Sequence, residues 1–225
     1  MVDTKNARPR GRPRAFDPDA AVATAQHLFH ERSYDDVSVA DITSTLGINP
    51  PSFYAAFGSK ARLFGKVLDR YACEGAIPLK QLLDPARPVV ACLAAVLEEA
   101  ACRYAGREGA AGCMVIEGVQ AIDDDARRAA MVFLMGAEAA IRDFVAARHP
   151  EAADRVVDYM TTVMMGLSTN ARRGHDHARL LESARLAVGG LEQAMAPPVH
   201  AGVDGVVHAT DGRTLHQRRN AAGRG

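Results

Sequence analysis

The sequence predicts an all-α protein, built from a small N-terminal domain of short helices and a larger domain of long helices. Apolar residues recur at helical spacing along most of the 225 residues, whereas the alternation typical of strands is nearly absent. Helix start signals, each a capping residue followed by an apolar stripe, are dense in the first third of the chain. The hydrophobic fraction of 48% and the charged fraction of 24% are ordinary for a globular protein.

The first helix is predicted to run from Asp17 to about Arg32. Asp17 can act as the N-cap, and Pro18 occupies a first-turn position, where a backbone N–H would have no partner in the helix. The apolar residues that follow share one face at the spacing of a core stripe, and they are Val22, Ala25, Leu28 and Phe29.

A second helix is expected to begin after Ser38. Ser38 and Asp41 form a Ser-x-x-Asp capping pattern, and Ile42 and Leu46 provide the apolar stripe that follows it. Gly47 ends this helix, because glycine readily adopts the left-handed conformation needed just past a helix end.

Two consecutive prolines follow, in the stretch GINPPSFYAAFGSK, and we expect them to begin a third helix. Asn49 is a good N-cap, and Pro50 takes the first helical position, where its missing N–H costs no hydrogen bond. Pro51 is tolerated in the same turn for the same reason. This helix runs to about Phe57, and Ser59 then caps a fourth helix.

Three short helices, with a glycine-centred turn between the second and third, describe a helix-turn-helix, which we place at about residues 38–57. The second helix of such a pair enters the major groove, and its N-terminal end points backbone N–H groups and small side chains at phosphates and bases. A helix that begins with two prolines has few hydrogen-bond donors at its N-terminal end, so we expect it to read bases partly by apolar contact with thymine methyl groups.

The stretch SVADITSTLGINPPSFYAAFGSKARLF resembles the DNA-binding region of TetR-family transcriptional regulators. The shared features are a Ser that opens the second helix, the glycine turn, a Phe-Tyr-x-x-Phe run and a Ser-Lys pair that opens the fourth helix. The upstream stretch AAVATAQHLFHERSYDDVSV resembles the family's first helix, so the resemblance covers residues 16–71. It implies a DNA-binding domain at 15–75 of a repressor that binds a palindromic operator as a dimer and is released by a small-molecule effector.

The resemblance also implies roles for individual residues. Tyr54 and Lys60 would each reach a backbone phosphate, while Phe53 and Phe57 would pack inward. The expected DNA contacts of this domain are Ser38, Asn49, Pro50, Pro51, Ser52, Tyr54, Ala55 and Lys60.

The sequence departs from the family pattern in two places. Ser33 stands where the family often has glycine, which predicts a strained or altered turn after the first helix. Ala55 and Ala56 replace the polar residue or histidine common nearby, and this change removes a phosphate contact.

The arm formed by residues 1–14 is strongly basic, although the formal net charge of the whole chain is zero. Its RPRGRPR stretch resembles the core of an AT-hook, in which glycine lies on the floor of the minor groove and arginines seek the negative potential of A·T-rich DNA. We expect Arg10, Arg12 and Arg14 to enter the minor groove. The alternative is a solvated basic tail that adds only sequence-independent phosphate affinity.

Several classes of protein find no support in the sequence. No apolar run approaches the roughly 18 residues that cross a bilayer, and no signal peptide is visible, so we expect a cytoplasmic protein associated with the bacterial nucleoid and no membrane partner. The four cysteines lack zinc-like spacing, and His175-Asp176-His177 reads as a helix cap with exposed histidines, so we expect no metal and no cofactor. Motifs of serine hydrolases, P-loop proteins, dinucleotide-binding enzymes and zinc proteases are absent, so we expect no enzyme.

From about residue 78 the helical patterns become longer and richer in alanine. Helices are predicted at 88–105, 110–122, 124–148, 151–172 and 177–195, and the segment from 196 to 225 is predicted to be disordered. By resemblance, residues 78–195 would form a ligand-binding and dimerisation domain. The candidate dimer-interface residues are Val156, Met160, Val163, Leu167, Leu181, Ala184, Val188 and Leu191, although the core of a monomer would produce the same stripes.

A pocket for an unknown small apolar effector is expected among the helices at 88–148, where soft side chains gather. The candidate lining residues are Cys113, Met114, Ile116, Glu117, Met131, Phe133, Leu134 and Met135. Two alternatives to a ligand-responsive repressor stay open. One is a redox-sensing DNA-binding regulator that uses Cys113, and the other is an architectural protein that binds A·T-rich grooves through its arm.

Overall fold

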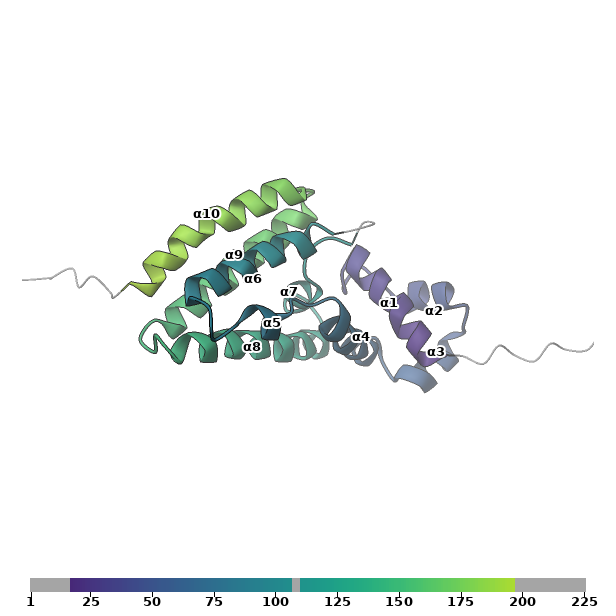
Figure 1. The fold of residues 1–225 in the computed structure, drawn as a ribbon. Helices are drawn as coiled ribbons and strands as arrows, with labels where there is room; N and C mark the ends of the chain where they lie inside the picture. Colours follow the sequence, from purple (N-terminus) through teal and green to yellow (C-terminus); the bar gives the residue numbers. More distant parts are fainter. Residues whose placement is uncertain (1–16, 107–109, 197–225) are drawn as a thin grey trace, which may run out of the picture.

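The computed structural model describes residues 17–106 and 110–196 (Figure 1). The basic arm with Arg10, Arg12 and Arg14, and the predicted tail beyond Ala196, lie outside the described residues. All elements of the described part are helices, which confirms the all-α prediction. A group of short helices at one end joins a larger bundle of long helices at the other (Figure 1).

The small N-terminal group consists of four helices, and their ends agree with the capping signals in the sequence. They are α1 (Pro18–Arg32), α2 (Val39–Leu46), α3 (Pro50–Phe57) and α4 (Lys60–Glu74). A side-chain oxygen accepts a hydrogen bond from a first-turn backbone N–H in every case, and the four capping residues are Asp17, Ser38, Asn49 and Ser59. Local sequence therefore sets where each of these helices starts.

An aromatic cluster fills the centre of this group. Phe29 of α1 stacks on Tyr34 with ring centroids 5.6 Å apart, and it meets Phe64 of α4 edge-on at 5.2 Å. Phe53 and Phe57 of α3 are buried, with 0% and 4% of their surface exposed, as the sequence predicts. Buried rings of this size are a large part of the hydrophobic stabilisation of so small a unit, and they fix α3 in place.

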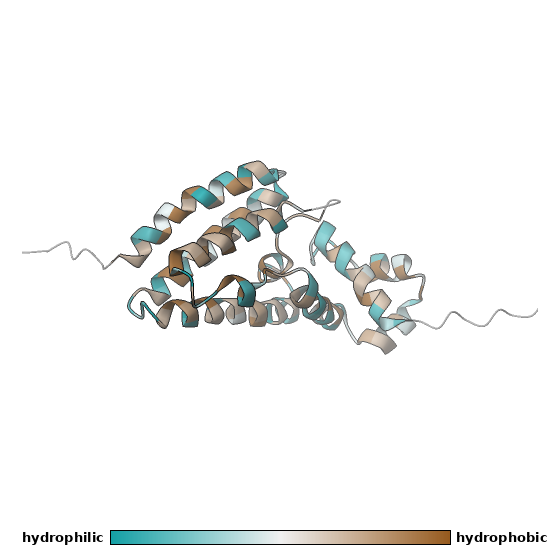
Figure 2. Cartoon of the chain, viewed as in Figure 1, coloured by the Kyte–Doolittle hydropathy of each residue, from teal (hydrophilic) through white to brown (hydrophobic). Residues whose placement is uncertain are grey.

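The described part of the larger bundle contains four long helices and two short ones. They are α5 (Leu79–Leu82), α6 (Val89–Tyr104), α7 (Met114–Gly118), α8 (Asp124–Ala146), α9 (Ala153–Arg172) and α10 (His177–Met195). α10 packs on α6 and α9, while α8 packs on α9 and on α4 of the small group. Figure 2 shows that α6, at the centre, is mostly hydrophobic, whereas hydrophobic and hydrophilic residues alternate along the outer α10. Among the described helices, none is both long enough and apolar enough to cross a bilayer.

Two short helices differ from the sequence prediction. The helix predicted at 110–122 is only the five-residue α7. Gly112, at a φ of 83°, turns the chain just before α7, and its N–H is bonded back to the carbonyl of Tyr104. α5 is absent from the prediction, because four residues are too few to show a stripe and no side chain caps them.

The apolar stripes of the last two helices lie largely inside the single chain. Five of the eight predicted interface residues are at most 3% exposed, and they are Val156, Met160, Leu167, Ala184 and Leu191. These side chains form the core of the bundle, so they are not available to a second copy of the chain. The remaining three, Val163, Leu181 and Val188, are half-buried.

The segment before α7 joins the bundle to α1. His30 of α1 is hydrogen-bonded through Nε2 to the carbonyl of Gly112 at 3.1 Å, and Arg172 of α9 donates to the carbonyl of His30 at 3.0 Å. Arg172 also lies 3.3 Å from the carboxylate of Glu117. Burial lowers the pKa of His30 below its ordinary value of 6.5, so the neutral ring is favoured at this junction.

The end of α7 and the segment that leads from it into α8 are joined to the small group as well. The Tyr34 hydroxyl donates to Asp123 at 3.0 Å, and burial together with this bond raises the pKa of Tyr34. Phe64 of α4 lies so close to Gly118 that a Cβ on Gly118 would come within 3.0 Å of the ring. α7 is therefore a shared wall between the small group and the bundle.

Candidate nucleic-acid interface

The start of α3 has a fixed geometry. The N–H of Gly47, in the left-handed conformation at a φ of 64°, bonds to carbonyls in the last turn of α2. Asn49 then caps α3, and its Oδ1 accepts the N–H of Ser52 at 2.9 Å. Pro50 and Pro51 occupy the first two helical positions, as the sequence predicts. The tip of α3 is thus held by its own residues, without help from a ligand.

α3 has one buried face and one open face. The predicted contact residues on the open face are all exposed, and they are Asn49, Pro50, Pro51, Ser52, Tyr54 and Ala55. Tyr54 is 52% exposed and rests edge-on against the buried ring of Phe53, with centroids 5.3 Å apart. All six side chains are therefore accessible from outside the protein, on and beside a helix that buries Phe53 and Phe57. α3 carries no charged side chain, so this surface is neutral.

Ser38 is occupied by the cap of α2. Its hydroxyl accepts the N–H of Asp41 at 3.1 Å, and its own N–H donates to the Asp41 carboxylate at 2.8 Å. These two bonds form the capping box that the sequence predicts. Hydrogen bonds from the Ser38 hydroxyl and N–H, and the nearby Arg32, lower the pKa of Asp41 to about 2.

Lys60 points into the protein rather than outward. Its Nζ donates to the carbonyls of Tyr34 and Val37, at 3.0 and 2.9 Å, and lies 4.0 Å from the centre of the Tyr34 ring. Burial lowers the pKa of Lys60. The structure thus gives this lysine an internal role, which is to hold the chain between α1 and α2 against α4.

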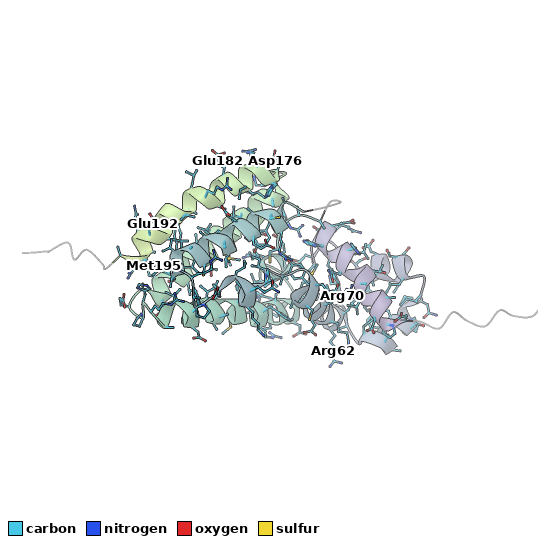
Figure 3. The ribbon with its side chains drawn as sticks, in the orientation of Figure 1. Arg62, Arg70, Asp176, Glu182, Glu192 and Met195 are labelled. Carbon is cyan, nitrogen blue, oxygen red and sulfur yellow. The ribbon has the colours of Figure 1, made fainter. Side chains whose placement is uncertain are left out.

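Arg62 is a cation near α3 that the sequence prediction leaves out. It is exposed on the first turn of α4, and its side chain lies over Gly58 at the end of α3. Figure 3 shows Arg62 projecting away from the ribbon. Its place two residues after the Ser-Lys pair is the signal that could have identified it, since Lys60 and Arg62 cannot both turn inward at that spacing.

The strain predicted at Ser33 is present. Ser33 has a φ of 72° and a ψ of 165°, and it is the one residue other than glycine with a positive φ among the described residues. This backbone conformation is essentially restricted to glycine, and a residue with a side chain that adopts it loses on the order of 1–3 kcal/mol of stability. Ser33 ends α1, and its hydroxyl donates to Asp36 at 3.1 Å.

A cavity of about 530 Å³ lies in the bundle, between the α5 and α8 side and the central helices. Four of the predicted pocket residues line it, and they are Cys113, Ile116, Phe133 and Leu134. The sequence prediction misses the contributions of α4, α5, α6 and α9, which include Tyr71, Leu79, Tyr104, Thr161, Met164 and Met165. Those helices could not be placed around the cavity without knowledge of their packing.

The other four predicted pocket residues do not line this cavity. Met131 and Met135 lie on the outer face of α8, where they are 38% and 59% exposed. Met114 is buried in the core, and Glu117 faces Arg172 at the junction. The structure does not bring these four residues to the cavity, and on α8 it is the rotation of the helix that turns Phe133 and Leu134 inward and Met131 and Met135 outward.

Two tyrosines meet Cys113 at the wall of the cavity. Burial raises the pKa of Tyr71 and of Tyr104, and the neighbouring thiol contributes in the same direction. Both hydroxyls therefore stay protonated at neutral pH and offer uncharged polar contacts. The Cys113 N–H donates to Ser168 of α9 at 2.9 Å.

The comparisons with known proteins agree with this geometry. Residues 21–67 match the family described as bacterial regulatory proteins, tetR family. The chain is 51% identical over 187 residues to the HTH-type transcriptional repressor BdcR of Escherichia coli (strain K12), across 83% of this chain and 95% of BdcR. It is 29% identical over 186 residues to the HTH-type transcriptional repressor ComR of the same strain, across 78% and 89%.

A similar solved structure is a cysteine mutant of the TetR-family regulator CifR in complex with 26-base-pair operator DNA. The TM-score is 0.70 at 29% sequence identity, and the match covers 79% of this chain and 98% of that chain. Because half of the aligned residues are identical to those of BdcR over nearly the whole of that repressor, the chain belongs to the tetR family of bacterial regulatory proteins and is a DNA-binding transcriptional repressor, not an enzyme.

Proposed function

We propose that this cytoplasmic repressor binds a palindromic operator as a homodimer, and that a small molecule in the bundle cavity releases it. The observation that carries the DNA-binding half is the open face of α3. Six predicted contact residues are exposed on and beside this helix, which Asn49 caps and which packs on the protein through the buried Phe53 and Phe57. A short helix fixed in this way fits the major groove end-first.

Because the exposed surface of α3 is neutral, we expect it to recognise the DNA sequence by shape and by contact with methyl groups. The affinity for DNA would then come from cations beside α3. Pro50, Pro51 and Ala55 offer apolar surface suited to thymine methyl groups. Because Lys60 is engaged internally, we assign the phosphate contact on this side to Arg62 and to the hydroxyl of Tyr54. The arm with its arginines, outside the described residues, remains our proposed minor-groove element.

Dimerisation is proposed because one recognition helix reads too few base pairs for a specific operator. The exposed sides of α9 and α10 are the surface we favour for it. They carry half-buried Val163, Leu181 and Val188, exposed Leu186, and the small residues Gly166 and Gly189, which permit close approach of two helices. Sedimentation of the unaltered protein and of the Leu186→Glu variant tests this surface, because the variant should shift the protein from dimer to monomer.

The shared wall α7 supports the coupling between effector and operator. Val115 and Ile116 of α7 line the cavity, while Gly118 at its end touches Phe64 of α4. A ligand that displaces α7 therefore also displaces α4 and its attached α3, and this changes the spacing of the two recognition helices in the dimer.

The decisive experiment measures operator binding by variants of the open face. A palindrome selected from randomised DNA serves as the operator. Tyr54→Phe and Arg62→Ala should each weaken binding to all duplexes, and Arg62→Ala should also reduce the salt slope by about one. Arg128→Ala, which removes an exposed cation from the bundle, is the matched control. Full affinity in both test variants would contradict the proposed docking.

The redox alternative is not favoured. Cys113 is buried, with 9% of its surface exposed, and it contacts two tyrosines rather than a second thiol. The related proteins are named as repressors.

A further inference from the structure

The cavity holds a single carboxylate. Glu138 of α8 is the only acid among the lining residues, most of which are apolar. Its Oε1 accepts the hydroxyl of Thr161 of α9 at 3.0 Å, and both residues are half-buried. Within the described residues, no lysine, arginine or histidine lies within ion-pair distance of Glu138.

Two cations of α8 and α5, Arg142 and Lys80, form no ion pair with Glu138. Arg142, one turn further along α8, feels the charge of Glu138, but its Nε donates to Asp154 at 2.8 Å rather than to Glu138. Lys80 of α5 lines the cavity but is exposed. Other exposed lining residues, Gln81, Gly136 and Ala140, mark the same side, so the cavity reaches solvent between α5 and α8. A carboxylate whose one hydrogen bond within the described residues comes from the Thr161 hydroxyl therefore borders a largely apolar space.

We propose that the effector is an organic cation, with an apolar body and a protonated amine that binds the carboxylate of Glu138. This inference rests on the proposed function, because it names the ligand class of the same cavity. A charged group bordering an apolar site lacks the solvation it has in water, and an ammonium replaces that solvation with a charge-assisted hydrogen bond. A volume of about 530 Å³ suits a ligand of drug size.

The rest of the lining fits the same class. Phe133, Leu134 and Met164 provide apolar surface for the body of the ligand. The hydroxyls of Tyr71 and Tyr104 are neutral at neutral pH and add no charge to the cavity. An anionic effector would instead meet Glu138 inside and would find its only lining cation, Lys80, at the solvent side.

The test uses three probes with one apolar body and different ends: 4-phenylbutylamine, 4-phenylbutan-1-ol and 4-phenylbutyrate. Calorimetry on the full chain should show the amine binding about 10- to 100-fold more tightly than the alcohol or the acid. Glu138→Gln should remove this preference while leaving affinity for the alcohol within a few-fold. Asp143→Asn removes the same charge from an exposed position of α8 and should keep the preference.

The outcomes separate this inference from the proposed function. Equal or tighter binding of the acid or the alcohol to the unaltered protein overturns the cation proposal, as does an amine that fails to bind, and neither result needs a variant to fold. An amine preference that survives in folded Glu138→Gln overturns it too. If the unaltered protein failed to bind any operator even before a probe was added, that result would contradict the proposed function instead.

Discussion

The small N-terminal group and the large bundle are stabilised in different ways. Every helix from α1 to α4 has a side-chain cap, and aromatic rings fill the space between them. In the bundle, α5, α6, α7 and α9 have no side-chain cap, and a cavity of about 530 Å³ lies among the helices. Local sequence thus sets where every helix of the DNA-facing part starts, whereas α5, α6, α7 and α9 of the bundle depend on packing for their position.

The largest expected effect compares two phenylalanines, one from each region. Phe53→Ala removes a fully buried ring and should lower the free energy of unfolding by about 3–5 kcal/mol. Phe133→Ala acts at a half-buried ring that already borders empty space, and it should cost less than about 2 kcal/mol. Urea denaturation of both variants measures the difference. Equal losses would show that the two regions do not differ in packing.

The next effect concerns the boundary between the regions. A Cβ added by Gly118→Ala would lie 2.7 Å from the Ala130 side chain and 3.0 Å from Phe64, so we expect a cost of about 1–3 kcal/mol. Operator affinity should fall as well, although Gly118 is far in sequence from α3. Gly136→Ala, at a helical glycine with open space, is the control and should not destabilise the protein. Denaturation and operator titration read out both effects.

Local capping can be separated from DNA contact at Asn49. Asn49→Ala loses the bond to the Ser52 N–H and should cost about 1 kcal/mol of stability. Asn49→Asp keeps a capping oxygen, so stability should be retained, but the new negative charge should weaken operator binding. If Asn49→Asp bound the operator as tightly as the unaltered protein, Asn49 would not lie near the phosphates.

A smaller, opposite effect is expected at Ser33. Ser33→Gly relieves a backbone conformation at a φ of 72° and should raise stability by about 0.5–1 kcal/mol, even though the bond to Asp36 is lost. Thermal unfolding against a Ser33→Ala control, which keeps the strain, isolates the backbone term. A stabilised alanine variant would contradict this explanation.

The smallest effect is the response of the α2 cap to acid. The pKa of Asp41 is lowered in the folded protein to about 2, from 3.8, so its contribution to stability is present above pH 3.8 and is lost as the pH falls towards 2. The exposed position of Asp41 keeps the effect small. NMR titration of the Ser38 N–H, which donates to Asp41, should report a midpoint near 2, and Asp41→Asn should abolish the transition.

The same difference between regions explains what the sequence could predict. Caps such as Ser38 and Asn49 act within three residues, so the starts of α2 and α3 follow from local pattern alone. Around the cavity, Met131 and Phe133 share an apolar helix, and only its rotation against α9 and α4 decides which side chain faces inward. The inward direction of the Lys60 side chain likewise depends on the carbonyls of Tyr34 and Val37, which lie more than twenty residues away in sequence and belong to no motif.

One consequence follows from α7, the helix that lines the cavity and supports α4. If an effector weakens operator affinity by some factor, thermodynamic linkage requires the operator to weaken effector affinity by that same factor. Repressor molecules that are bound to the operator should therefore need a higher effector concentration for ligand binding than free molecules. The effector concentration required for induction is then set by the affinity of the DNA-bound form.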